Sequence, residues 1–252
     1  MAVLTSDAVV LRTWPVHEAD LIVSLFTRDY GKLRGVAKSA LKSRKRFGGA
    51  LEPMTVARAW FAEKPKQELV RLDQLEIVTS PLAAPVDAIR LSALSFYAEV
   101  LDEALPDHDP HETIFRLVLS VLEQTAPRGP EPSQPWMPLT YFSLWMTRLM
   151  GLLPDLAHCT ICHEALRPAE VWCNQHADGL FCAVHRHTSD SQLSPDSWTL
   201  AQRMLRAPAS SFTAEEWPRR RGQDLRRLTL HVLERHLERK IKSAEMLARL
   251  GR

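Results

Sequence analysis

The sequence predicts an α+β multidomain protein, in which a small β-barrel is followed by a helical domain that carries an embedded metal module. Three observations support this prediction. The first 80 residues hold short segments rich in β-branched and aromatic residues, the later residues show apolar side chains at helical spacing, and cysteine pairs interrupt the helical part. The length of 252 residues exceeds a typical domain of about 100 to 150 residues, which also indicates more than one compact unit.

Five segments near the start of the chain predict strands. They are residues 7–14, 20–27, 31–37, 53–61 and 68–78. Several alternate apolar with polar side chains, and turn-forming residues separate them. Because no stretch between them is long enough for a crossover helix, we predict a small closed antiparallel barrel. We expect an OB-fold over residues 1–80, and a small SH3-like barrel remains the alternative because composition does not separate the two.

Beyond residue 80 the apolar spacing becomes helical. We expect helices over residues 89–105, 112–125 and 139–152, and one long amphipathic helix over residues 223–250. The helix at 139–152 is apolar nearly all round, which is typical of a buried central helix. The predicted domains are a barrel at 1–80, a first helical part at 81–158, a metal module at 159–190 and a second helical part at 191–252.

Two ligand pairs predict the metal module. Cys159-Thr-Ile-Cys162 is followed, after nineteen residues, by Cys182-Ala-Val-His185. A Cys-x-x-Cys turn points both thiolates at one centre, and two such turns, called knuckles below, complete a tetrahedron. We therefore predict one structural Zn²⁺ per chain, bound by Cys159, Cys162, Cys182 and His185. Four protein ligands leave no open position for water, so catalysis by this metal is not expected.

The fourth ligand is open to alternatives. Cys173 and His176 lie between the two pairs, and either could replace His185 as a ligand. Gly179 stands just before the second pair, where we expect it to permit the tight backbone of a knuckle.

The net charge of +2 is unevenly distributed. Residues 1–80 carry +4, residues 81–158 carry −6 and residues 159–252 carry +4. Because the field of a charged surface acts within a Debye length of about 8 to 10 Å, this pattern predicts separate surfaces with separate partners.

A basic segment in the barrel region predicts nucleic-acid binding. No acidic residue lies between Asp29 and Glu52. The cations expected to contact phosphates there are Arg34, Lys38, Lys42, Arg44, Lys45 and Arg46. Phe47 is expected to offer a face for base stacking. Trp14 and Trp60 are further candidates for stacking, but on alternating strands we expect them in the core. A solvated loop that only aids solubility is the alternative.

A second basic stretch follows Trp217, with eleven Lys and Arg against four acids. Arg219, Arg220 and Arg221 in it are expected to extend the DNA-binding surface, or to form the polar side of a helix. The chain has no phosphate-binding loop, no nucleophile elbow and no carboxylate pair in a motif context, so we do not expect an enzyme. It also shows no membrane-spanning run and no secretory signal, which predicts a cytoplasmic protein. The expected DNA binding would make it nucleoid-associated.

Several motifs, in order along the chain, resemble landmarks of the RecO family of bacterial recombinational repair proteins. They are Glu18-Ala-Asp20, Tyr30-Gly-Lys-Leu33, Cys159-x-x-Cys162, Asp178-Gly-Leu-Phe-Cys182 and Ile241-Lys-Ser-Ala-Glu-Met246. One departure concerns the metal module, because many relatives have Cys where this chain has His185.

The resemblance implies a mediator of DNA repair and homologous recombination. Such a protein would bind single- and double-stranded DNA, anneal complementary strands and, with RecR, promote RecA loading on DNA coated by single-strand-binding protein (SSB), in the RecF pathway. It also implies that the acidic C-terminal tail of SSB docks on the helical domain. We expect a local basic and apolar patch for that tail, with help from the helix at 223–250.

Two other function classes remain open. One is a zinc-stabilised adaptor that binds protein and makes no direct contact with DNA. The other is a nuclease or DNA-modifying enzyme, which the four-ligand metal site disfavours.

Overall fold

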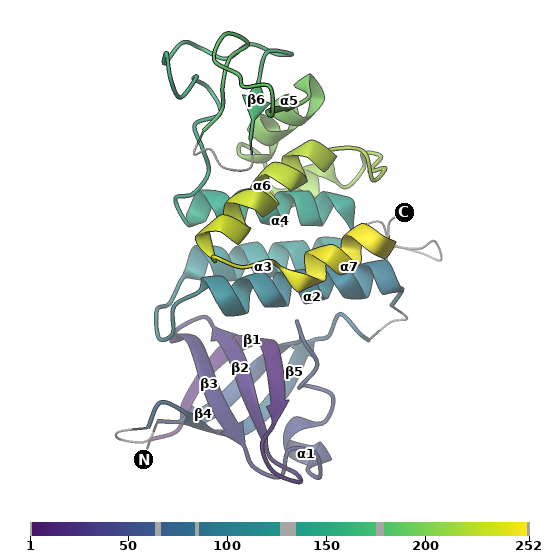
Figure 1. The fold of residues 1–252 in the computed structure, drawn as a ribbon. Coiled ribbons are helices and arrows are strands. Elements are labelled where there is room, and N and C mark those ends of the chain that lie inside the picture. Colours follow the sequence, from purple (N-terminus) through teal and green to yellow (C-terminus); the bar gives the residue numbers. More distant parts are fainter. Residues whose placement is uncertain (1, 64–66, 84–85, 127–134, 175–178, 251–252) are drawn as a thin grey trace. The chain divides into compact units, whose positions relative to one another are not determined.

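The first five strands form a closed barrel in the computed structural model, which describes residues 2–63, 67–83, 86–126, 135–174 and 179–250. The strands are β1 (Leu4–Pro15), β2 (Leu21–Thr27), β3 (Gly31–Ala37), β4 (Val56–Ala62) and β5 (Val70–Thr79). They neighbour one another in the order β1-β2-β3-β5-β4, and β4 returns to β1 (Figure 1). This order confirms an OB-like barrel. The pairing of β3 with β5 is parallel, so the expectation of a purely antiparallel barrel was wrong.

The barrel interior is filled by alternate residues of each strand. Val23 and Leu25 of β2 face Leu33 and Phe61 there, all fully buried. A single helical turn, α1 (Arg44–Phe47), follows β3 and adds Phe47 to the same core.

Helices α2 (Ala88–Ala104), α3 (Glu112–Thr125) and α7 (Lys242–Leu250) belong to the same compact unit as the barrel, α3 up to Leu122. In Figure 1, α7 lies beside α2, and the two helices share many contacts. The Glu99 carboxylate in α2 accepts the N–H groups of Lys242 and Ser243, at 3.0 and 2.8 Å, and so caps the start of α7.

The end of α2 and the connection between α2 and α3 cover part of the outer face of β2 and β3. Lys32 is 5% exposed, and its Nζ donates to the Asp102 carbonyl at 2.6 Å and pairs with Asp107 at 3.2 Å. The Ser24 hydroxyl donates to the Asp102 carboxylate at 2.6 Å. At Gly31, with φ +69°, a Cβ atom would collide with the Asp109 backbone. These contacts cover the part of the sheet surface around Ser24 and Lys32. They do not cover the part around Ile22 and Val36.

The second compact unit holds α4 (Trp136–Leu149), α5 (Pro195–Met204), the short 3₁₀ helix η1 (Ala209–Phe212), α6 (Gln223–His236) and the metal module. Most of α4 is buried, which confirms the expectation of a central helix, and α4 packs against α6. The module contains two two-residue strands, β6 (Trp172–Cys173) and β7 (Ser191–Gln192). No helix among the described residues is long and apolar enough to span a bilayer.

One long helix over 223–250 was a wrong prediction. The chain leaves the helix after α6, and Glu238 takes a left-handed conformation with φ 52°. Residues 242–250 then form α7, which lies with the barrel and not with α6. The contacts therefore divide residues 191–252 between two units, in contrast to the single helical part expected from the sequence.

Candidate metal centre and nucleic-acid interface

The two knuckles bring four ligand atoms together. Those of Cys159, Cys162, Cys182 and His185 all lie within 4.8 Å of one another. Cys162 Sγ is 4.0 Å from Cys182 Sγ, and Cys159 Sγ is 3.9 Å from His185 Nδ1. Tetrahedral zinc with Zn–S bonds of about 2.3 Å sets its sulfur atoms about 3.8 Å apart. The cluster therefore has the spacing and the donor set of a tetrahedral metal site.

Backbone hydrogen bonds hold each knuckle closed and hold the two together. The N–H of His163 donates to Cys159 O at 2.9 Å, and that of His185 donates to Cys182 O at 3.1 Å. Thr160 in the first knuckle donates both its N–H, at 2.9 Å, and its hydroxyl, at 3.1 Å, to Leu180 O just before the second. The four ligands are positioned by this backbone frame.

The Cys159 thiol is prepared for metal binding. Burial acts to raise its pKa, but backbone hydrogen bonds from Cys162, Cys182 and Ile161 together outweigh burial and bring the pKa to about 6. A thiol with this pKa is mostly thiolate at neutral pH, which is the form that binds metals.

Cys173 lies outside the cluster. Its Sγ contacts Ser191 O at 3.5 Å across the β6–β7 pair. Burial first, and then the charges of Asp224 and Asp190, raise its pKa to about 11, so it stays a neutral thiol. The structure thus groups His185 with the cysteine ligands and leaves Cys173 out. His176, the other alternative ligand, lies outside the described residues.

The predicted phosphate-binding cations lie on the outside of the barrel. Arg34 is exposed on β3, and Lys38, Lys42, Arg44 and Lys45 are exposed in the segment that ends in α1. Arg46 is half-buried, because its guanidinium donates to the Lys38 carbonyl at 2.7 Å and to the Ser43 hydroxyl at 3.0 Å. Five cations are thus available to solvent, and Arg46 also holds the segment in shape.

The aromatic side chains are placed differently from the prediction. Phe47 is 1% exposed in the barrel core, so the expectation that it stacks on bases was wrong. Trp14 and Trp60 are half-buried on their strands, not core residues as expected. For Trp14 the cause is a β-bulge between Val10 and Arg12, which reverses the alternation of inward and outward side chains along β1.

Comparison with known proteins agrees with these features. The family model "Recombination protein O N terminal" matches residues 1–81, and "Recombination protein O C terminal" matches residues 85–245. The chain belongs to the RecO family. A relative from Koribacter versatilis named DNA repair protein RecO is 49% identical over 245 residues, which cover 97% of this chain and 98% of the relative. Relatives of the same name from Anaeromyxobacter sp. strain K and Bifidobacterium adolescentis are each 30% identical, over 96% and 98% of this chain and 95% and 100% of theirs.

The two RecO family models meet where the barrel ends. The first stops at residue 81, just after β5, and the second starts at residue 85, shortly before α2. The second match covers the metal cluster and reaches α7. Family membership therefore extends over both compact units.

The part of the second basic stretch up to Lys240 lies in the unit of α4 and α6. Arg221 forms an ion pair with Glu215, and Arg219 lies 5.7 Å from the ring centre of Trp136. Arg220 is exposed. Of the three arginines expected to bind DNA, Arg221 is thus paired with a carboxylate that it shares with Arg203, and Arg220 presents its charge to solvent.

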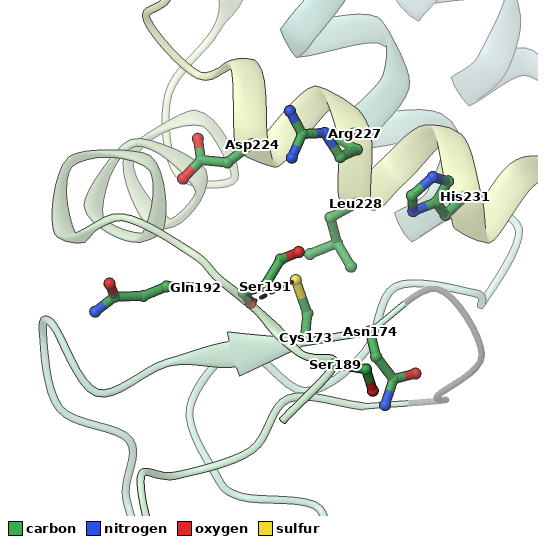
Figure 2. A pocket seen from close by; sticks show the side chains of 9 residues that line it. All are labelled: Cys173, Asn174, Ser189, Ser191, Gln192, Asp224, Arg227, Leu228 and His231. Carbon is green, nitrogen blue, oxygen red and sulfur yellow. Dashed lines mark hydrogen bonds between the residues drawn. The ribbon is translucent and has the colours of Figure 1, made fainter. Parts of the chain in front are cut away.

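A cavity of about 300 Å³ lies between the β6–β7 pair and α6. Figure 2 shows Asp224, Arg227 and His231 along α6 on one side of it, with Cys173 facing them from the β6–β7 side. The Asp224 carboxylate accepts hydrogen bonds from the Ser194 N–H, at 2.6 Å, and the Ser197 hydroxyl. This acid therefore connects the start of α5 to α6.

Proposed function

We propose that the chain is a non-enzymatic mediator of DNA repair and homologous recombination. It binds single- and double-stranded DNA, anneals complementary strands and, with RecR, promotes RecA loading on SSB-coated DNA in the RecF pathway. Its place is the cytoplasm, at the nucleoid. The observation that carries the proposal is the group of exposed cations on an OB-like barrel, in a segment without acids. The curated relatives named DNA repair protein RecO support it.

Strand annealing requires that the phosphate charges be neutralised, and it requires no covalent reaction. Two strands repel each other through their phosphates, and cations on one protein surface lower this repulsion while the bases pair. No covalent bond is made or broken in that process. The basic segment supplies such cations at Lys38, Lys42, Arg44 and Lys45, and Arg220 supplies another on the second unit.

We further propose that Cys159, Cys162, Cys182 and His185 bind one structural Zn²⁺. Three thiols and one imidazole within 4.8 Å of one another form a donor set that suits zinc. The metal would link the two knuckles, and binding in small zinc modules contributes on the order of 10 to 16 kcal/mol. The chain's own part is to hold the ligands at the right spacing through the bonds between Thr160 and Leu180.

For the SSB tail we propose a docking surface that includes α7. This helix exposes Met246 (51%) and Leu250 (38%), and it also exposes the cations Lys242 and Arg249. The cations match the charge of the acidic tail, and the apolar side chains on the same short helix offer it a nonpolar contact. The expected basic and apolar patch thus has support in the exposed residues of α7.

A strand-annealing assay on SSB-coated DNA tests the proposed function. Measuring the DNA-binding constant at several salt concentrations distinguishes the proposed function from an adaptor that binds only protein. For a protein that neutralises Z phosphates on single-stranded DNA, the logarithm of the binding constant falls with the logarithm of the salt concentration with a slope near −0.7Z. Replacement of Lys42, Arg44, Lys45 and Arg46 by Ala should reduce both affinity and slope. Arg58→Ala is the matched control, because Arg58 is an exposed barrel cation already paired with Asp7. Unchanged binding in the four-residue variant would remove the basic segment from the interface.

A further inference from the structure

We propose that the outer face of β1, β2 and β3 carries a base-stacking platform, formed by Arg12, Trp14, Ile22, Arg34 and Val36, that binds unstacked bases of single-stranded DNA. This inference rests on the proposed DNA-binding function and divides it into two parts. The basic segment binds the phosphates of any DNA, whereas the platform selects single strands.

The strand register places these side chains in two adjacent rows. In the first row Trp14 is opposite Ile22, and Ile22 is opposite Val36. In the second row Arg12 and Arg34 lie on either side of Ser24. Directly opposed residues share one face of a sheet. Because Val23, between the two rows, points into the barrel core, both rows face outward.

Burial defines the limits of the platform. In the second row, α2 covers Ser24, because the Ser24 hydroxyl donates to the Asp102 carboxylate of α2. In the other row, Trp14, Ile22 and Val36 are half-buried, so each shows part of an apolar side chain to solvent. The surface therefore pairs an apolar row with two exposed arginines.

Charge on the platform matches a nucleic acid. Arg12 and Arg34 are exposed, and the Arg12 guanidinium lies 5.1 Å from the ring centre of Trp14. Two acids of the flanking segments are engaged elsewhere, since Asp20 accepts the Ser39 N–H at 2.7 Å and Asp73 pairs with Arg71 at 2.8 Å. A cation beside a half-buried indole that shows part of its ring to solvent is a combination that suits a phosphate and its base.

The platform also continues into the basic segment. Lys38 follows β3 directly, two residues beyond Val36, and its carbonyl accepts a hydrogen bond from Arg46. A strand whose bases contact Trp14 can thus have its phosphates near Lys38 and the cations that follow. In a duplex the base faces are stacked on one another, so Trp14 has no partner there.

Paired binding measurements on single-stranded and duplex oligonucleotides, with the intact chain at fixed salt, test this division. We expect Trp14→Leu to weaken single-strand binding by about 5- to 100-fold and to leave duplex binding and both salt slopes unchanged. Trp14→Phe, which keeps an aromatic face, should retain most of the single-strand affinity. Trp60→Leu is the matched control, because Trp60 is also half-buried but is paired with Thr5 and Gln74 on another part of the barrel.

The outcomes separate the platform from the wider function. The platform is overturned, with DNA binding itself retained, if Trp14→Leu and Trp60→Leu reduce single-strand affinity equally. It is also overturned if Trp14→Leu, at the melting temperature of the parent, loses single-strand and duplex affinity equally. If the Trp14→Leu protein has a lower melting temperature than the parent, the Trp14→Phe protein provides the test. The platform is overturned if Trp14→Phe loses as much affinity for single-stranded DNA as Trp14→Leu does. Failure of the parent chain to bind either DNA would overturn the proposed function itself.

Discussion

Gly179 and Thr160 touch so closely that no side chain fits between them. A Cβ atom at position 179 would lie 2.6 Å from Thr160 Cβ and 2.8 Å from its Cγ2, whereas real Cβ contacts essentially never fall below 3.0 Å. Thr160 belongs to the first knuckle, and Gly179 lies three residues before Cys182, which begins the second. The glycine is therefore required by the approach of the two knuckles, not by the conformation of one of them.

Gly179→Ala should separate the knuckles and weaken zinc binding. We expect a loss of about 10- to 100-fold in affinity, as for other residues that support metal ligands. Competition with a chromophoric chelator at neutral pH measures it. Adding Thr160→Gly, which removes the three clashing side-chain atoms, should restore part of the affinity, with Thr160→Gly alone as the control. A Gly179→Ala protein with parental affinity would contradict the packing argument.

Removal of the metal should unfold residues 159–185 locally and leave the barrel folded. The expected signature is fast hydrogen exchange in the module after chelation, with continued protection of β1 to β5. Protection lost in both regions together would show that the module and the barrel unfold as one.

Single substitutions test the ligand assignment. Cys159→Ala and His185→Ala should lower the zinc content, whereas His185→Cys should keep it because a thiolate also suits zinc. Cys173→Ser should keep one zinc per chain, because Cys173 lies outside the cluster. Metal analysis of the purified proteins is the measurement, and loss of zinc from Cys173→Ser would reassign the fourth ligand.

Sequence patterns predicted those parts of the fold that depend on local chemistry. Alternating β-branched residues gave all five barrel strands to within a few residues, and the spacing of Cys159, Cys162, Cys182 and His185 predicted a cluster, because such pairs have to converge on one centre. The face of Trp14 was not predictable, because one bulged residue reverses the alternation and carries no composition signal. The segment around Glu238, where the helix ends, contains no Gly or Pro, so the helical spacing of apolar residues continues across it in the sequence.

The bond between Ser24 and Asp102 should couple the barrel to α2 energetically. Ser24 is fully buried and Asp102 is 7% exposed. Asp102→Ala leaves the Ser24 hydroxyl without this acceptor, so we expect a loss of about 1 to 3 kcal/mol of unfolding free energy. A double-mutant cycle with Ser24→Ala should give a coupling energy of about 0.5 to 3 kcal/mol in urea unfolding. Ser95→Ala, at an exposed serine of α2, is the control, and additive effects of the two substitutions would disprove the coupling.

Asp224 should make the helical unit less stable in acid. Burial acts to raise its pKa, but hydrogen bonds from Ser197 and Ser194 outweigh burial and hold the pKa below the ordinary value of 3.8. The stabilisation is therefore complete above about pH 4 and is lost as the pH falls through the lower pKa of the folded state.

Asp224→Asn tests this dependence. We expect a loss of about 1 to 3 kcal/mol at pH 7, and the difference from the parent should shrink towards pH 3. Urea unfolding across this range measures it, with Asp196→Asn, at an exposed acid in the first turn of α5, as the control. A difference that stays constant with pH would show that the charge of Asp224 is not what stabilises the unit.

The capping of α7 by Glu99 has a consequence for the order in which the chain folds as it is made. Glu99 and Lys242 are 143 residues apart in the sequence. At about 5 to 20 residues per second, the ribosome needs roughly 7 to 30 s to deliver α7 after α2 has emerged. Every residue of α4, α5, α6 and the metal module is synthesised within that interval. The unit that begins first is thus finished last, and the face of α2 that α7 covers stays open while the rest of the protein is made.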